Sequence, residues 1–421
     1  MICHRSYGRS DGAGLETGGE MADSDGQMVS RRAALRLGVG GLIGLAAPAI
    51  IGSRTAFSAP LRNGQILTTP NLNLRPDQYT VVAGLRPQRV GGVRIGLDPV
   101  LSRDIGKTVI HNYGHGGAGI TLSFGCAARV VTALETIFNA QPRSRVAILG
   151  SGIAGMTVAF ELLSRWHQLR LRILTRSQNI EDSTSWVAGG QFGPSGILQY
   201  YQQNPGELVS MVRGSADRVK AHFSKGSAQR FGIRQRFNYS LGDVLDLKAI
   251  KSVIGEPKTG NLPFEHLTDQ ANGYEYNTYL IEPKIALKEL AREVTKNGGR
   301  ILWGHPVGSL QDMAQLPETV IVNCTGLGSW HLIGDHALSA VEGQLAVLKN
   351  TQALKYFVSG GCNGTNAYMF GRTNDLTIGG TTDDIPIRPD RLPVARPDIN
   401  KGDRLVKRMR TFLGGHPEQC V

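Results

Sequence analysis

The chain has 421 residues, of which 41% are hydrophobic, and it is long enough for two packed domains. Glycine is frequent, with 54 residues, nearly twice the average share of about 7%, and it falls in short G-G and G-x-G clusters that indicate tight turns. The formal net charge is +12, but the basic residues near the C-terminus carry no interleaved aromatic side chains, which argues against nucleic-acid binding and predicts a solvated helix face.

The first 60 residues have the pattern of an export signal. They are polar at first, with Met21 and Met28 as alternative starts, and the pair Arg31-Arg32 precedes an apolar run at 37–51. That run is shorter than the roughly 20 residues of a membrane span. The arginine pair resembles a twin-arginine signal, so we expect export after folding, cleavage and a periplasmic protein. The alternative is an uncleaved N-terminal membrane anchor. Residues 60–80 are expected to be a linker.

A glycine-rich unit follows the linker. Pro87 and paired glycines are expected to interrupt short apolar pieces between 81 and 94. Residues 108–111 predict a strand, and the loop at 112–119 has glycine at four of its eight positions. Apolar residues then recur at helical spacing from 120 to 138. This strand–loop–helix unit places a helix N-terminus where it can face an anion.

A second unit of the same kind carries the strongest motif. Residues 146–149 predict a short buried strand, residues 150–155 fit G-x-G-x-x-G, and 156–166 predict an amphipathic helix. The first glycine permits the tight turn, the second lets the backbone approach a pyrophosphate, and the third lets helix and strand pack closely. With another strand at 169–174, the unit predicts a dinucleotide site. A tight turn without a ligand is the alternative.

The remaining sequence is less specific. Residues 182–196 form a loop of small residues, and 198–270 contain no readable motif. Further elements are expected as strands at 274–280, 320–323, 341–348 and within 367–380, with a helix at 283–296. The cysteines expected to be core thiols are Cys126, Cys324 and Cys362. No metal site is predicted, because a glycine loop gives His111 and His115 no ligand geometry.

Several stretches together resemble the D-amino-acid oxidase family of flavoproteins. They are GLRPQR, VIHNYGHGGAGITLSFGCA, VAILGSGIAG, STSWVAGGQFGP, NTYLIEP, VNCTG, EGQLAVL, AYMFG and LTIGGT. In the family the first two follow the dinucleotide motif, whereas here they precede it, at 84–126. The order therefore resembles a circular permutation with its join at 139–145. The alternative is a rearranged gene with a non-functional product, against which the two retained glycine loops argue.

The resemblance implies an α/β fold, with a Rossmann-like FAD-binding domain and a smaller mixed-sheet (α+β) substrate domain in circularly permuted order. We expect the FAD-binding domain at 78–197 and 301–340. The substrate domain is expected at 198–300 and 341–421, where it ends in a C-terminal helix.

The resemblance also implies a reaction. An FAD enzyme of this kind takes a hydride from the Cα of a D-amino acid, or of a small amine such as glycine or sarcosine. The imino acid hydrolyses to a keto acid, and O2 is reduced to H2O2. The cofactor carries this chemistry, and the protein orients the substrate.

Three residues are implied to touch the substrate. Arg86 binds its carboxylate, for which a planar guanidinium is suited, and the Tyr368 hydroxyl reaches the same carboxylate. The Gly117 carbonyl accepts a hydrogen bond from its amine. The alternatives are a surface arginine and an ordinary strand tyrosine. The residues implied to hold the cofactor are Gly116, Gly119, Ile120, Thr121, Gly150, Gly152, Ile153, Ala154, Gly155, Thr184, Ser185 and Gly190.

The sequence departs from the family at three places. The strand at 169–174 ends without the acid that usually binds the adenosine ribose, Gly364 stands where the family has a second active-site tyrosine, and Ala118 stands where some members have tyrosine. The first change leaves the contact with the ribose unassigned, and the last two leave the substrate less defined than the flavin.

Two other functions stay open at this point: a flavin dehydrogenase with a non-oxygen acceptor, and a flavin-binding scaffold without catalysis. A nicotinamide dehydrogenase is disfavoured because the loop at 112–119 has no role in one. The expected partners are the small-molecule substrate, O2, the twin-arginine translocation machinery and a second copy in a homodimer.

Overall fold

The computed structural model describes residues 65–141, 143–241, 251, 254–267, 273–362 and 365–415, with the side chains of 361–366 left out. All of them fall within one compact unit. The expected export signal and Gly364 lie outside the described residues.

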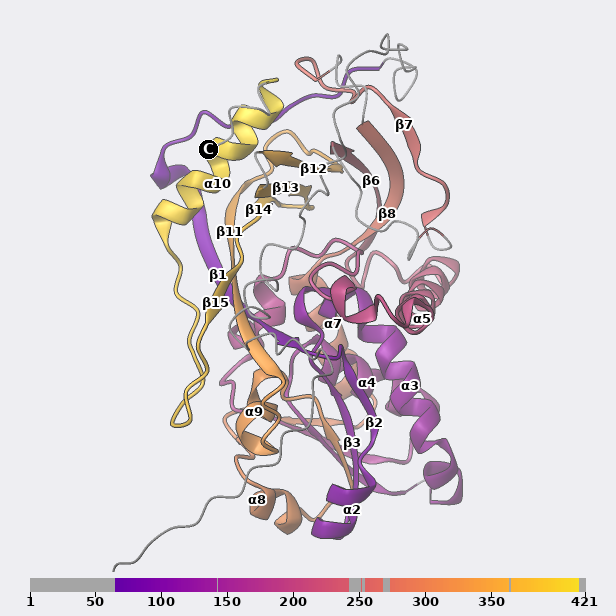
Figure 1. Cartoon of the computed structure of the whole chain (residues 1–421). Coiled ribbons are helices and arrows are strands. Elements are labelled where there is room, and N and C mark those ends of the chain that lie inside the picture. The colour runs from indigo at the N-terminus through magenta and orange to yellow at the C-terminus, as the bar shows by residue number, and fades with distance from the viewer. Residues whose placement is uncertain are drawn as a thin grey trace, which may run out of the picture. The chain divides into compact units, whose positions relative to one another are not determined.

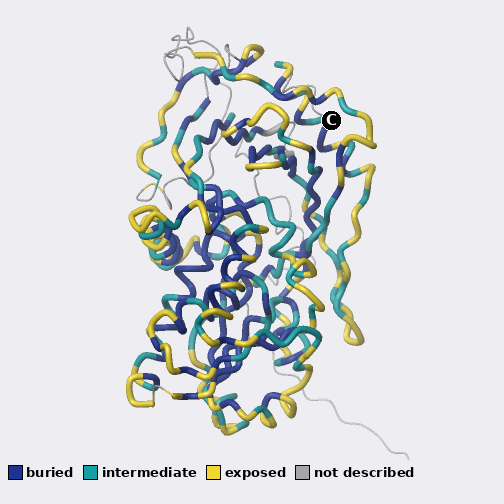
Figure 2. The backbone as a smooth tube through the Cα atoms, turned by 180° about the vertical axis from the view of Figure 1, so that it is seen from behind, coloured by how far each residue is buried: buried dark blue, intermediate teal, exposed yellow. Residues whose placement is uncertain are grey.

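A six-stranded sheet carries both glycine loops (Figure 1). Its order is β2 (Arg94–Leu97), β3 (Thr108–Tyr113), β10 (Val320–Asn323), β4 (Arg145–Leu149), β5 (Arg170–Leu174) and β9 (Arg300–Leu302). All neighbours pair in parallel except β2 and β3. Parallel strands with both faces covered are expected to be continuously apolar. Strand β10 is buried along its whole length, and β3 and β4 are buried after their first residue, in the buried centre that Figure 2 shows in dark blue.

Helices cover the two faces of this sheet. One face packs against a core shared by α3 (Gly119–Ala140), α4 (Ile153–Arg165), α5 (Pro205–Ser224) and α7 (Pro283–Lys296). The other face packs toward α2 (Pro99–Ile105), α8 (Leu310–Gln315) and α9 (Ser329–Leu332). Alternate residues of β4 show the division, because Val146 and Ile148 enter the first core while Ala147 and Leu149 enter the second.

The second sheet has nine strands and is mostly antiparallel. Its order is β1 (Thr80–Arg89), β11 (Leu338–Lys349), β14 (Asp375–Gly379), β13 (Thr365–Gly371), β12 (Tyr356–Cys362), β6 (Ile233–Leu241), β8 (Gly273–Ile281) and β7 (Lys258–Gly260), with β15 (Asp383–Ile385) also paired to β11. Helix α10 (Ile399–Leu413) packs on one face through Leu405, Met409 and Phe412. We call the opposite face the inner face.

The α/β fold with two sheets is confirmed, as are the predicted strands around both glycine loops and the helix at 283–296. Helix α10 exposes Arg404, Lys407 and Arg410, which confirms the solvated helix face predicted near the C-terminus. Cys126 and Cys324 are buried free thiols, while the side chain of Cys362 lies outside the described residues.

Two expectations about the fold were wrong. Strand β1 runs unbroken through Pro87, because β1 is an edge strand where a missing N–H costs little. The boundaries expected for the domains also cut across the sheets. Strand β1 lies in the nine-stranded sheet although 78–197 was assigned to the FAD-binding domain. Helices α5 and α7 pack on α3 and α4 although 198–300 was assigned to the substrate domain.

Helix α3 is the central helix of the larger core. With the turn before it, it is long and apolar enough to cross a membrane, but most of its length is buried inside the fold. It approaches α5 through glycine: the Gly125 N–H donates to Ser215 Oγ at 2.7 Å, and a Cβ on Gly125 would overlap the carbonyl of Met211. The two helices can therefore pack this closely only if Gly125 has no side chain.

We expect Gly125→Ala to lower the free energy of unfolding by about 3 kcal/mol, because the added methyl group forces α3 away from α5. Urea unfolding measures the change. The matched control is Gly206→Ala, an exposed position in α5 whose nearest atom to an added Cβ lies 3.9 Å away. It should change stability by less than about 0.5 kcal/mol. Equal stability of the two variants would contradict the close contact.

Candidate functional site

The two glycine loops lie at the same edge of the six-stranded sheet. Strands β3 and β4 flank β10 in parallel, so their carboxyl ends meet. The turn after β4 is tight: Gly150 has φ +105°, and a Cβ there would lie 2.5 Å from the carbonyl oxygen of Cys324. A Cβ on Gly155 would overlap the carbonyl oxygen of Gly150. The geometry therefore requires glycine at both positions.

The start of α4 forms a cradle of backbone donors. Gly152 is the N-cap and supplies no capping side chain, and the N–H of Ile153 donates to Ser185 Oγ at 3.0 Å. A Cβ on Gly152 would meet only Ser185 Oγ, at 3.3 Å. Free N–H groups at a helix start and a surface without Cβ atoms suit a pyrophosphate. The structure brings Gly150, Gly152, Ile153, Ala154, Gly155 and Ser185 together in an arrangement that fits the pyrophosphate of FAD.

The first glycine loop supplies a second helix start beside this cradle. Helix α3 begins at Gly119 after the short turn Gly116–Ala118, and its N-cap also lacks a side-chain hydrogen bond. A Cβ placed on Gly119 would lie 3.9 Å from the side chain of Ile153 on α4. Gly117 is exposed although its neighbours on both sides are buried. The backbone of Gly117 is therefore accessible to a ligand at this point.

His115 in this loop is buried and neutral. Its Nε2 has no hydrogen-bond partner among the described residues, and burial lowers its pKa from 6.5 to about 4. His115 also pairs with Gln88 of β1 as an isolated bridge. The loop is thereby attached to the nine-stranded sheet.

The segment 183–197 joins the two loops to the inner face. Near its start, Ser185 Oγ accepts the hydrogen bond from the first N–H of α4. Near its end, Gly196 lies against Gly116, and its carbonyl accepts a hydrogen bond from Gln88 Nε2 at 3.1 Å. Between these, the N–H of Gly193 donates to Thr121 Oγ1 at 2.9 Å, and that hydroxyl donates back to the Gly193 carbonyl at 2.8 Å. Polar and backbone contacts therefore attach the segment to α3, α4 and β1.

Four of the expected cofactor residues have structural contacts of their own. The Thr121 hydroxyl is occupied by Gly193, and the neighbouring Ile120 is buried. The methyl group of Thr184 faces Gly84 of β1. Gly190 has φ +98° and packs on Ile281 of β8. For Thr184 and Gly190 these contacts are with strands of the nine-stranded sheet.

Arg86 and Tyr368 both lie on the inner face. Directly opposed residues of antiparallel strands share a face, and the register connects Arg86 with Val341 and Tyr368 with Gly379. The Arg86 guanidinium lies over Gly343, where any Cβ would overlap it, and its Nη2 donates to Thr381 O at 3.4 Å. No carboxylate of the described residues pairs with Arg86. A guanidinium has five N–H donors, so at least three of those of Arg86 are available to an anion.

The Tyr368 ring lies over a glycine in the same manner. A Cβ on Gly379 would overlap the phenol, and the ring stacks on Phe370 with centroids 4.6 Å apart. Gly379 and Thr381 are two residues apart, so the phenol and the Arg86 guanidinium approach the same end of β14. The structure thus brings the two residues together from strands that are not neighbours.

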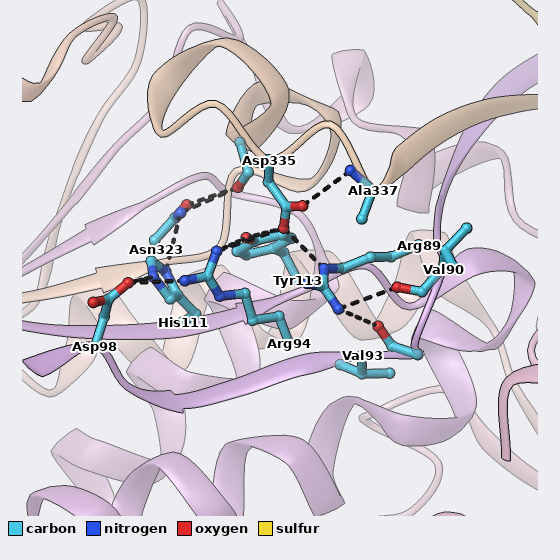
Figure 3. Close-up of polar contacts among 12 residues, drawn as sticks. Arg89, Val90, Val93, Arg94, Asp98, His111, Tyr113, Asn323, Asp335 and Ala337 are labelled. Atoms are coloured by element: carbon cyan, nitrogen blue, oxygen red, sulfur yellow. Dashed lines mark hydrogen bonds and ion pairs between the residues drawn. The ribbon is translucent and has the colours of Figure 1, made fainter. Parts of the chain in front are cut away.

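A buried polar network fixes the end of β1 (Figure 3). Asp335 Oδ2 accepts hydrogen bonds from the Tyr113 hydroxyl at 2.5 Å and from Arg89 Nε at 2.8 Å. Burial alone would raise the pKa of Asp335, but these donors hold it below its ordinary value. Arg94 donates to Tyr113 at 3.0 Å and to Asp98 at 2.8 Å. The network therefore joins β1, β2 and β3 to the segment after α9.

His111 belongs to this network. Its Nε2 lies 3.1 Å from Asp98 Oδ2 and its Nδ1 lies 3.3 Å from the Asn323 amide. Burial lowers the pKa of His111 despite the contact with Asp98. Within the described part of the chain no group of three His, Cys, Asp or Glu residues is placed to hold a metal ion.

Sequence reasoning missed the residues that shape the inner face. Gly343 and Gly379 provide the space for Arg86 and Tyr368, and Asp335 anchors the end of β1. The glycines in EGQLAVL and LTIGGT were a usable signal, because glycine inside a strand often marks a close approach. Asp335 gave no signal, since its side-chain partners Arg89 and Tyr113 lie more than 200 positions away in the sequence.

Comparisons with known proteins show which sequences and structures this chain resembles. A model of the family described as FAD dependent oxidoreductase (DAO) matches residues 145–419. The chain is 28% identical over 258 residues to a D-amino-acid oxidase of Streptomyces coelicolor, covering 60% of this chain and 74% of the relative. It is 23% identical over 245 residues to D-aspartate oxidase of Homo sapiens, covering 56% and 68%. A solved glycine oxidase from Geobacillus kaustophilus is 16% identical with a TM-score of 0.46, covering 66% of this chain and 80% of that one.

The buried His115 predicts a pH dependence of stability. Because its pKa is about 4 in the folded chain and 6.5 otherwise, the unfolded chain binds more protons between these values. Stability is therefore lost as the pH falls from about 6.5 to 4, by up to about 3 kcal/mol from this group. Urea unfolding at pH 7 and pH 4.5 should show that His115→Gln reduces the difference between the two pH values.

The control for that measurement is His167→Gln, because His167 is exposed. It should leave the difference between pH 7 and pH 4.5 as in the unaltered chain. If His115→Gln and His167→Gln gave the same pH dependence, His115 would not be the buried titrating group.

Proposed function

Because this chain belongs to the FAD-dependent oxidoreductase family, whose model matches residues 145–419, we propose that it oxidises a D-amino acid to the imino acid, which hydrolyses to the keto acid, with O2 reduced to H2O2. Its membership in the family makes it an enzyme that uses FAD and acts on an amino donor. The stereochemistry of the substrate and the acceptor O2 are part of the proposal.

The position of Arg86 is the observation on which the proposal depends. It is half-buried on the inner face and has no carboxylate partner among the described residues. A guanidinium held flat over Gly343 presents a planar fork of donors, which binds both oxygens of a carboxylate. The geometry therefore suits a free amino acid better than an amine that lacks a carboxylate.

Other residues orient the substrate around that anchor. The Tyr368 hydroxyl approaches the same end of β14 and can donate a second hydrogen bond to the carboxylate. The exposed backbone at Gly117 offers a carbonyl for the substrate amine. The uncapped start of α3 favours negative charge nearby. The chemistry that bound FAD supplies is acceptance of a hydride from the substrate Cα.

We include the circular permutation and the export in the proposal. Strand β3 and helix α3 precede the dinucleotide motif in the chain, yet β3 pairs with β10 and α3 packs on α4. Such contacts support a rearranged order. The twin-arginine signal, the periplasmic location, the uncleaved anchor as its alternative, and the homodimer stay predictions from the sequence.

The experiment that tests the proposed function is an anaerobic titration of the purified holoenzyme with a panel of D-amino acids. We expect a yellow protein whose visible flavin absorbance bleaches with substrate and returns on admission of O2. In the oxidase assay, Arg86→Ala should raise KM about a hundredfold, because the lost charged hydrogen bonds are worth about 3 kcal/mol. Bleaching that only an added dye reverses would favour a dehydrogenase. Bound flavin that no amine reduces would favour a scaffold without catalysis.

Gly343→Ala tests the placement of the guanidinium without removing it. The new methyl group would overlap the Arg86 guanidinium, so we expect KM to rise about tenfold or more, a loss of at least about 1.4 kcal/mol. The flavin spectrum should stay that of the unaltered protein. Gly206→Ala, far from the inner face, is the matched control and should keep the original KM. An unchanged KM in Gly343→Ala would remove Arg86 from its assigned position.

A further inference from the structure

A carboxylate shares the inner face with Arg86. Asp384 on β15 is paired with Val341 on β11, and Arg86 on β1 is paired with the same valine from the other side. Directly opposed residues point to one face, so Arg86 and Asp384 flank Val341 on the inner face. Two strand spacings separate their Cα atoms by about 10 Å.

The neighbouring contacts agree with this assignment of faces. Lys401 of α10 lies on the opposite face and contacts Glu342 at 3.2 Å and Asp383 at 2.9 Å. Glu342 and Asp383 are paired with each other and adjoin Val341 and Asp384. Since successive side chains of a strand alternate between faces, Asp384 points away from α10.

Asp384 forms no ion pair with the described residues. The inner-face carboxylate Asp375 forms an ion pair with Arg372, whereas no Lys, Arg or His of the described residues pairs with Asp384. Partial burial, with the nearby Asp383, raises the pKa of Asp384. The side chain is nevertheless exposed enough for a ligand to reach. A cation brought to this place would therefore gain a partner that the fold does not provide.

On the premise of the proposed function, we propose that Asp384 determines specificity by binding a positively charged substrate side chain. The preferred substrates are then cationic D-amino acids such as D-lysine. With the α-carboxylate on Arg86, an extended lysine side chain spans about 6 Å from Cα to its ammonium, enough to cross from the guanidinium toward Asp384. An acidic side chain in the same place would be repelled.

The test compares two substrates of equal length on the full-length holoenzyme. D-Lysine and D-norleucine differ by the terminal ammonium, so the ratio of their kcat/KM values isolates the charge. We expect the unaltered enzyme to prefer D-lysine, and Asp384→Asn to lower the ratio about tenfold. Asp384→Lys should shift the preference to D-glutamate. Asp390→Asn, a change of the same kind at an exposed position outside the strands, is the matched control and should keep the original ratio.

The outcomes separate this inference from the proposed function. If Asp384→Asn lowers kcat/KM equally for both substrates, or leaves the ratio unchanged, D-amino-acid oxidation stands and the role of Asp384 is overturned. If no D-amino acid reduces the flavin, the proposed function fails and this inference fails with it. A lowered ratio together with the shift in Asp384→Lys supports both.

Discussion

The site depends on one constraint, the anchoring of segment 183–197 between the two sheets. Ser185 accepts from the start of α4, Gly193 exchanges hydrogen bonds with Thr121 of α3, and the carbonyl of Phe192 accepts from Thr278 of β8 at 2.8 Å. Each bond joins the segment to a different element. Moving the segment would therefore break contacts with two helices of the six-stranded sheet and with a strand of the nine-stranded sheet at once. The distance between the cofactor cradle and the inner face is set by this segment.

The Asp335 network provides the complementary constraint at the end of β1. A buried carboxylate is costly unless it is paired and hydrogen-bonded, and Asp335 has Arg89 and Tyr113 as donors together with the N–H of Ala337. The fold therefore has one low-energy position for this end of β1. Since Arg86 lies three residues before Arg89, the network also limits where the guanidinium can reach. Asp335 therefore contributes to the position of Arg86 through the contact with Arg89.

The sequence predicted those parts of the fold that depend on local pattern. Residues 146–149 and 283–296 were assigned correctly because burial on both faces gives an unbroken apolar run and an amphipathic helix repeats every 3.6 residues. The course of β1 through Pro87 was not predictable locally, since an edge position is decided by partners 250 residues away. The positions of Gly343 under Arg86 and of Gly379 under Tyr368 depend on cross-strand register in the same way. The roles of Arg86 and Tyr368 came from the resemblance, and the structure explains how their side chains meet.

The pairing of the strands explains how segments distant in the sequence meet at one edge of the sheet. Strand β10 is far from β3 and β4 in the sequence, yet its hydrogen bonding to both neighbours aligns the carboxyl ends of the three strands. That alignment depends on the pairing of strands and not on which strand comes first. The connection from α3 to β4 is short and locally bonded, because Gln141 N–H donates to Ile137 O at 2.9 Å and Ser144 N–H donates to Gln141 O at 3.1 Å. These bonds and the strand pairing fix the start of α3 and the start of α4 at the same edge of the sheet. The placement of the two helix starts therefore depends on the register of the sheet.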